Sequence, residues 1–108
     1  MELREARIIY DLLLESKHQT LVKQLIKNAV HYSSMRVEWY LSGNKERNEI
    51  DRDRTLSHNS FISSCNALSR NMENVGEDIS WRQKIGTNRE EIGDFACLIN
   101  AIIGLNAR

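Results

Sequence analysis

The residues best suited to chemistry lie in a polar run near the middle of the chain. Asp51, Arg54 and His58 follow one another at spacings of three and four residues, and the run continues into an apolar stripe that begins with Phe61. On a helix this spacing places side chains on one face, so we expect all three polar groups on the core-facing side. A buried charge is costly unless it is paired. We therefore expect Asp51 and Arg54 to pair with each other, which leaves His58 for another partner.

A second polar set precedes a predicted turn. Tyr32, Arg36 and Tyr40 recur every four residues, and Ser42–Asn44 should end that helix. The turn would bring the end of one helix beside the start of the next. The two polar sets would then line one pocket.

The predicted ligand-binding residues are Arg36, Asp51, Arg54 and His58. Guanidinium groups suit a small anionic or phosphorylated ligand, and a histidine can donate or accept a proton near neutral pH. A different interpretation is a polar layer at one end of the bundle, or a subunit contact, whose groups satisfy one another and fix the register of the helices. The sequence leaves both interpretations open.

A carboxylate pair near the C-terminus offers a second kind of site. Glu91 and Asp94 stand one helical turn apart, and two carboxylates at that spacing can share a hard cation such as magnesium. They are the predicted metal-binding residues. The helix dipole also favours acidic side chains in a first turn, and this explains Glu90 and Glu91 without a metal.

Apolar periodicity predicts an all-α fold in one domain, residues 1–108. Proline is absent and there are only five glycines, so few positions force the backbone out of a helix. The stripe of the first helix should contain Leu3, Ala6, Ile9, Tyr10, Leu13 and Leu14, and Ile8 and Leu12 should widen it. The predicted architecture is an antiparallel bundle of four main helices with a short extra helical turn. The expected helices cover residues 3–15, 17–41, 45–74 and 87–104, and the turn lies within 76–86 around Trp81.

Three capping sites should set the ends of these helices. Ser16 with Gln19, and Thr87 with Glu90, have the spacing of capping boxes. Gly43 is expected in a left-handed conformation after the second helix.

Composition narrows the class of partner. Fifteen basic residues balance fifteen acidic ones, so neither nucleic acid nor a membrane is an expected partner. No apolar run reaches the roughly 20 residues that span a bilayer, and Met1–Glu5 lacks the form of a secretion signal. We therefore expect a cytoplasmic protein. Cys65 and Cys97 are expected to be reduced core residues, and no cofactor is expected for a binding module.

Residues 90–94, Glu-Glu-Ile-Gly-Asp, resemble the second acidic motif of the MazG-type all-α nucleotide pyrophosphohydrolases. The resemblance implies magnesium as a cofactor, held in part by Glu91 and Asp94. The family also has an earlier Glu-x-x-Glu motif, whose spacing is matched by Glu46–Glu49 and equally by Glu2–Glu5.

The second half of the chain is similar to small helical bacterial proteins known only as a domain of unknown function. The likeness is carried by Arg-Thr-x-x-His-Asn at 54–59, a tryptophan-bearing connection, and Ile-Gly-Asp-Phe-Ala at 92–96. It implies no activity.

The function predicted from sequence is a binding or regulatory module with a polar pocket for a small anionic ligand, or a surface for a protein partner; a homodimer is left open. The alternative is a magnesium-dependent nucleotide pyrophosphohydrolase using Glu46, Glu49, Glu91 and Asp94. A third hypothesis is a partner-binding bundle, as in small immunity or antitoxin-like proteins, for which an exposed apolar patch would be diagnostic.

Overall fold

The computed structural model describes residues 1–107, and this part of the chain contains five helices and no strand. The helices are α1 (Leu3–Leu14), α2 (Gln19–Leu41), α3 (Asn44–Asn74), α4 (Ser80–Ile85) and α5 (Arg89–Asn106). The predicted all-α bundle of four main helices with a short extra helix is confirmed. None of these helices is both long enough and apolar enough to cross a membrane.

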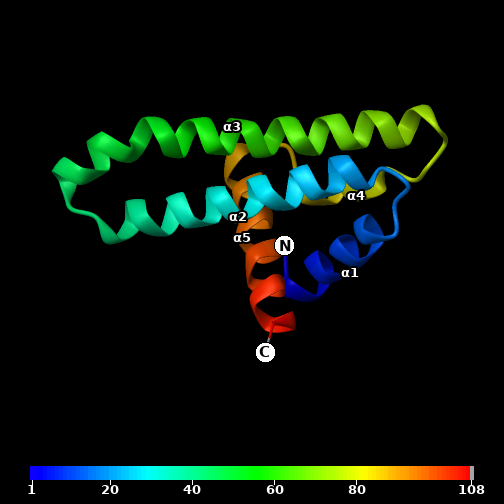
Figure 1. The fold of residues 1–108 in the computed structure, drawn as a ribbon, viewed down its shortest axis with the longest axis horizontal. Helices are drawn as coiled ribbons and strands as arrows, with labels where there is room; N and C mark the ends of the chain where they lie inside the picture. The colour runs from blue at the N-terminus through cyan, green and yellow to red at the C-terminus, as the bar shows by residue number, and fades with distance from the viewer. Residues whose placement is uncertain (108) are drawn as a thin grey trace.

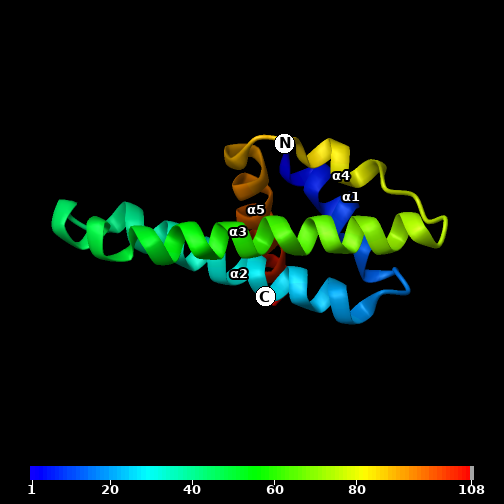
Figure 2. The ribbon, with the colours of Figure 1, turned by 90° about the horizontal axis from the view of Figure 1, so that it is seen from above.

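The two longest helices, α2 and α3, form an antiparallel hairpin, and their mutual contact is the most extensive in the fold (Figure 1). Helix α5 lies across this hairpin and packs mainly on α2, with a smaller contact to α3. Helices α1 and α4 cover the remaining part of the hairpin (Figure 2). In both views the end of the hairpin near residue 43 extends beyond the other helices.

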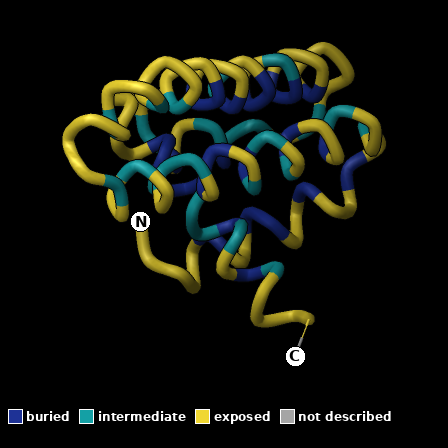
Figure 3. Tube along the Cα trace, turned by 60° about the vertical axis from the view of Figure 1, so that its left-hand side comes forward, coloured by how far each residue is buried: buried dark blue, intermediate teal, exposed yellow. Residues whose placement is uncertain are grey.

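The core lies where α2, α3 and α5 meet, and Figure 3 shows the buried segments facing one another there. Helix α3 contributes Phe61, Cys65, Leu68 and Met72; helix α5 contributes Ile92, Phe95, Ala96, Ile99 and Ile102. These residues recur every three or four positions, as a helix that buries one face requires. The short helix α4 adds Trp81 and Ile85, as the sequence predicted.

The two cysteines are free, and burial differs between them. Cys65 is fully buried, and desolvation by burial raises the pKa of its thiol to about 12. Cys97 is half-buried and packs against the edge of the core. The thiol of Cys65 is therefore a packing group.

The first helix buries a narrower stripe than predicted. Ala6, Ile9, Tyr10 and Leu13 are buried. Leu3, Ile8, Leu12 and Leu14 are exposed, so the prediction was wrong for these four residues. The helix packs mainly on α5, and one neighbour covers only a narrow stripe.

The predicted cap of α2 is wrong. The helix begins at Gln19 after an N-cap residue, His18, whose side chain makes no capping hydrogen bond. The Ser16 hydroxyl instead accepts a hydrogen bond from the His18 backbone N–H (3.1 Å), and the Gln19 side chain donates back to the carbonyl of Leu14 (3.0 Å). These bonds tighten the connection between α1 and α2.

Two other predicted caps are also corrected. Helix α5 is capped by Asn88 in place of Thr87: the Asn88 Oδ1 accepts from the backbone N–H of Glu91 at 2.8 Å. Asparagine is as good an N-cap as threonine or better, and it lies one residue closer to the helix. Gly43 has φ −75°, which is not left-handed, because it serves as the N-cap residue of α3. The glycines with positive φ are Gly76 and Gly86, in the connections on either side of α4.

Helix α5 approaches α2 closely at Gly93. A Cβ atom added to Gly93 would lie 2.9 Å from the Tyr32 hydroxyl oxygen and 3.1 Å from a carbon of the same ring. Tyr32 is 3 % exposed, so its ring has little room to move aside. The crossing of the two helices therefore depends on the absence of a side chain at this position.

We predict that Gly93→Ala destabilises the protein relative to Gly104→Ala. Alanine favours a helix over glycine by about 1 kcal/mol at either position. At Gly93 overpacking against Tyr32 should cost about 1–3 kcal/mol, whereas a Cβ at Gly104 meets no atom within 4 Å. Urea unfolding of both variants measures the difference. Equal stabilisation by the two substitutions would contradict the close packing.

Candidate functional site

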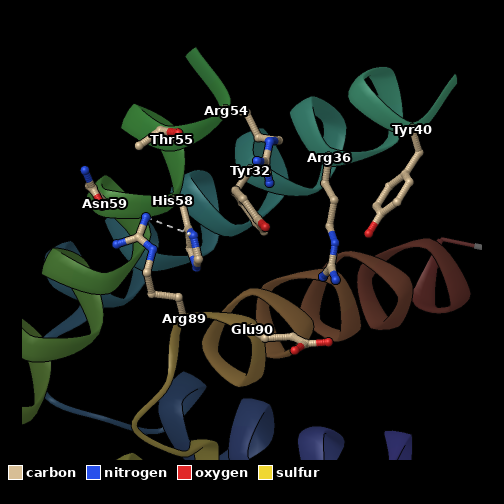
Figure 4. Close-up of a pocket in the computed structure, with 9 residues that line it drawn as sticks. All are labelled: Tyr32, Arg36, Tyr40, Arg54, Thr55, His58, Asn59, Arg89 and Glu90. Atoms are coloured by element: carbon tan, nitrogen blue, oxygen red, sulfur yellow. Dashed lines mark hydrogen bonds between the residues drawn. The ribbon is translucent and has the colours of Figure 1, made fainter. Parts of the chain in front are cut away.

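A pocket of about 440 Å³ opens where α2, α3 and the start of α5 meet (Figure 4). The lining residues are Tyr32, Arg36, Tyr40, Arg54, Thr55, His58, Asn59, Arg89 and Glu90. Helix α2 supplies the first three at intervals of four residues, and α3 supplies the next four from a single turn and a half. Helical periodicity is therefore what directs these seven side chains to one cavity.

Arg36 is fixed to α5. Its Nη1 donates to the Asp94 Oδ1 at 2.8 Å and lies 3.5 Å from the Cys97 Sγ. Burial works against the charged form, but the hydrogen bonds to Asp94 and Cys97 outweigh it and raise the pKa of Arg36. The guanidinium is therefore charged, and it forms an ion pair with the Asp94 carboxylate.

His58 lies at the inner end of the pocket and is 7 % exposed. Its ring stacks on Tyr32, with centroids 4.6 Å apart and planes 23° from parallel. The Nη2 of Arg89 lies 3.2 Å from the His58 Nδ1 (Figure 4). A guanidinium can only donate, so Nδ1 is the acceptor and the neutral ring carries its proton on Nε2.

Burial is the main cause that lowers the pKa of His58, and the positive charge of Arg89 adds to it. Arg54 and Arg36 act in the same direction. The ring is therefore neutral at pH 7, and Nε2–H is a donor. In the described part of the chain this buried nitrogen has no hydrogen-bond partner.

Arg54 lies between the pocket and the outer part of the hairpin. Its Nη2 donates to the Asp51 Oδ1 at 3.1 Å, and its guanidinium lies 4.6 Å from the centre of the Trp39 ring. The Nε of Arg54 is buried and finds no partner among residues 1–107. Two buried donors, on Arg54 and His58, are thus left unsatisfied around one cavity.

The third arginine is the least compensated. Among the described residues, no carboxylate forms an ion pair with Arg89. Glu90 is the carboxylate among the lining residues, and its side chain extends below Arg36 in Figure 4. Tyr32 remains a phenol, because burial raises its pKa although Arg36 opposes the shift. The cavity therefore presents mainly hydrogen-bond donors and positive charge.

Three of the four predicted ligand-binding residues, Arg36, Arg54 and His58, line this pocket. Asp51 does not. It pairs with Arg54 as predicted, but its side chain is 54 % exposed, so the expectation that it faces the core was wrong. The hairpin extends beyond α5 in this region, and no third helix covers that face of α3 (Figures 1 and 2).

The two predicted metal-binding residues, one turn apart on α5, have different neighbours. Asp94 bonds to Arg36, whereas Glu91 is exposed and its carboxylate lies close to Gly86. Glu46 and Glu49 lie on the first turns of α3, at the extended end of the hairpin. Residues 1–107 hold no group of three or more histidine, cysteine, aspartate or glutamate side chains arranged to bind a metal.

The sequence prediction missed Arg89, which belongs to no apolar stripe and lies 31 residues from His58. One signal was present. A positive charge at the first position of a helix opposes the helix dipole, so an arginine there needs another reason to be present. Thr55 and Asn59 were within the polar run but were not singled out as binding residues.

Comparisons with protein-family models, with curated proteins and with solved structures found no match to this chain. Both resemblances inferred from motifs remain predictions. The two motifs of the second one lie close together in the fold: Arg54 and His58 come from the first motif, and Gly93 and Asp94 of the second contact Tyr32 and Arg36.

The lowered pKa of His58 predicts how stability depends on pH. The unfolded state binds more protons than the folded state, so this contribution is present above about pH 6.5 and is lost as the pH falls toward the lower folded-state pKa. In urea unfolding between pH 7.5 and pH 5, His58→Gln should lose less stability than the wild type. His31→Gln, at an exposed position of α2, should follow the wild type. Identical pH profiles for wild type and His58→Gln would contradict this account of His58.

Proposed function

We propose that the protein is a binding module whose pocket holds a small anionic ligand of the phosphate type. The observation that carries the proposal is that three arginines, from α2, α3 and α5, line one cavity. Arginine binds phosphate through paired donors in a planar arrangement, which gives directional as well as electrostatic recognition.

Unsatisfied donors support a ligand site over an internally satisfied polar layer. A buried donor without a partner costs about 1–3 kcal/mol. A layer that only fixed helix register would be expected to pair its groups, yet His58 Nε2 and Arg54 Nε are buried without partners in the described chain. Both nitrogens are covered in the free protein, so side chains around them would have to turn before an anion in the cavity could accept from either.

The charge balance also supports an anion. Asp94 and Asp51 offset Arg36 and Arg54, so these two arginines stay charged without a large excess of positive charge in the free protein. Arg89 is exposed and has no such partner among the described residues. Its charge is therefore the one most open to a ligand, and Arg89 is the residue with which to test the proposal.

We predict that inorganic phosphate or pyrophosphate binds to the wild type and that Arg89→Ala weakens binding about 10-fold to 100-fold. Hydrogen bonds to charged groups are each worth about 1.5–3 kcal/mol. Isothermal titration calorimetry at low salt measures the affinity. The matched control is Arg70→Ala, an exposed arginine of α3 outside the pocket, which removes the same charge and should leave the affinity within about twofold.

A second variant should change the affinity for phosphate in the opposite direction. Glu90→Gln removes the lining carboxylate, which repels an anion, and should tighten phosphate binding by about twofold to tenfold. If Arg89→Ala and Arg70→Ala weaken binding equally, the effect comes from net charge and the pocket is not the site. Absence of measurable binding of either anion by the wild type would also reject the proposed function.

A further inference from the structure

The pocket is longer than a phosphate needs. Tyr32, Arg36 and Tyr40 lie on one face of α2, and eight residues at a rise of 1.5 Å place Tyr40 roughly 12 Å along the helix from Tyr32. The cavity of about 440 Å³ lies within the size range of pockets that hold whole organic ligands. An anionic group at one end would leave the rest of the cavity for another part of the same molecule.

The two ends differ in chemistry. The inner end carries His58 and Arg89, which contact each other, and Arg54 lies between this end and Trp39. The outer end carries Tyr40, which is 60 % exposed (Figure 4). An exposed aromatic side chain that lines a cavity is available for contact with a ligand.

The ring of Tyr40 is held in place although it is exposed. Trp39 packs against it edge to face, with centroids 5.2 Å apart and planes at 85°. Trp39 is itself fixed by two guanidinium groups, those of Arg47 and Arg54, each 4.6 Å from its ring centre. Arg47 also donates through Nε to the Trp39 carbonyl at 3.0 Å. The outer end of the pocket is therefore a braced aromatic surface.

Arg36 lies between the two ends. Its guanidinium is fixed by Asp94, and its side chain runs beside that of Tyr40 toward α5 in Figure 4. A planar guanidinium stacks on aromatic rings as well as binding anions. A flat ring could thus contact both Arg36 and Tyr40 while an attached anionic group reaches His58.

We infer that the ligand joins a phosphate-type anion to a planar aromatic group, with the anion at His58, Arg54 and Arg89 and the ring against Tyr40 and Arg36. This inference rests on the proposed function and specifies its ligand class. It requires the pocket to distinguish a flat ring from a puckered ring of similar size when both carry the same anionic group.

Phenyl phosphate and cyclohexyl phosphate test this requirement, because they have the same anionic group and similar size. In calorimetric titrations of the wild type we expect phenyl phosphate to bind about twofold to tenfold more tightly, the range for an aromatic pair. Tyr40→Ala should abolish the preference and leave the affinity for cyclohexyl phosphate within about twofold. Tyr40→Phe should keep the preference, and so should Leu41→Ala, a control at an 83 % exposed neighbour.

The outcomes separate this inference from the proposed function. Equal affinities of the wild type for the two esters would overturn the inference and leave the anion site intact. A preference that survives in Tyr40→Ala would also overturn it. If neither ester nor inorganic phosphate binds the wild type, the proposed function fails and the inference fails with it.

Discussion

The structure depends on the packing of one buried ring, that of Tyr32, at the point where three helices meet. Its face stacks on His58 of α3, and its tip lies against Gly93 of α5. Any side chain at Gly93 would displace the ring and, with it, the wall against which His58 is held. The crossing of α5 over the hairpin thus sets both the tight core and the inner end of the pocket (Figure 1).

The same crossing accounts for the electrostatics of the pocket. Helix α5 places Asp94 against Arg36, and it places Arg89 against His58, where a positive charge adds to the burial that lowers the pKa of the imidazole. A neutral histidine held by an arginine on Nδ1 has only a donor at Nε2, which is buried in the free protein. Positive charge and fixed donors therefore come from packing between helices, and this is the physical basis for the anion that we propose as ligand.

Local periodicity was enough to predict the helices, the buried stripe of α3 and the grouping of Arg36, Arg54 and His58, because each depends on spacing within one helix or across one short turn. The same periodicity placed Asp51 wrongly on the core-facing side. The stripe was projected along α3 past the point where α5 covers it (Figure 1). Periodicity could not find the contact of Arg89 with His58, nor that of Asp94 with Arg36. Both contacts depend on where α5 crosses the hairpin, and no spacing within a single helix encodes that position.

The protonation state of His58 can be measured by nitrogen-15 NMR of the imidazole, with the signals assigned by their loss in His58→Gln. At pH 7 we predict a neutral ring with its proton on Nε2, and a shift of the Nε2 resonance when inorganic phosphate is added. A ring that is already an imidazolium at pH 7 in the free protein, or nitrogen shifts that phosphate leaves unchanged, would contradict this prediction.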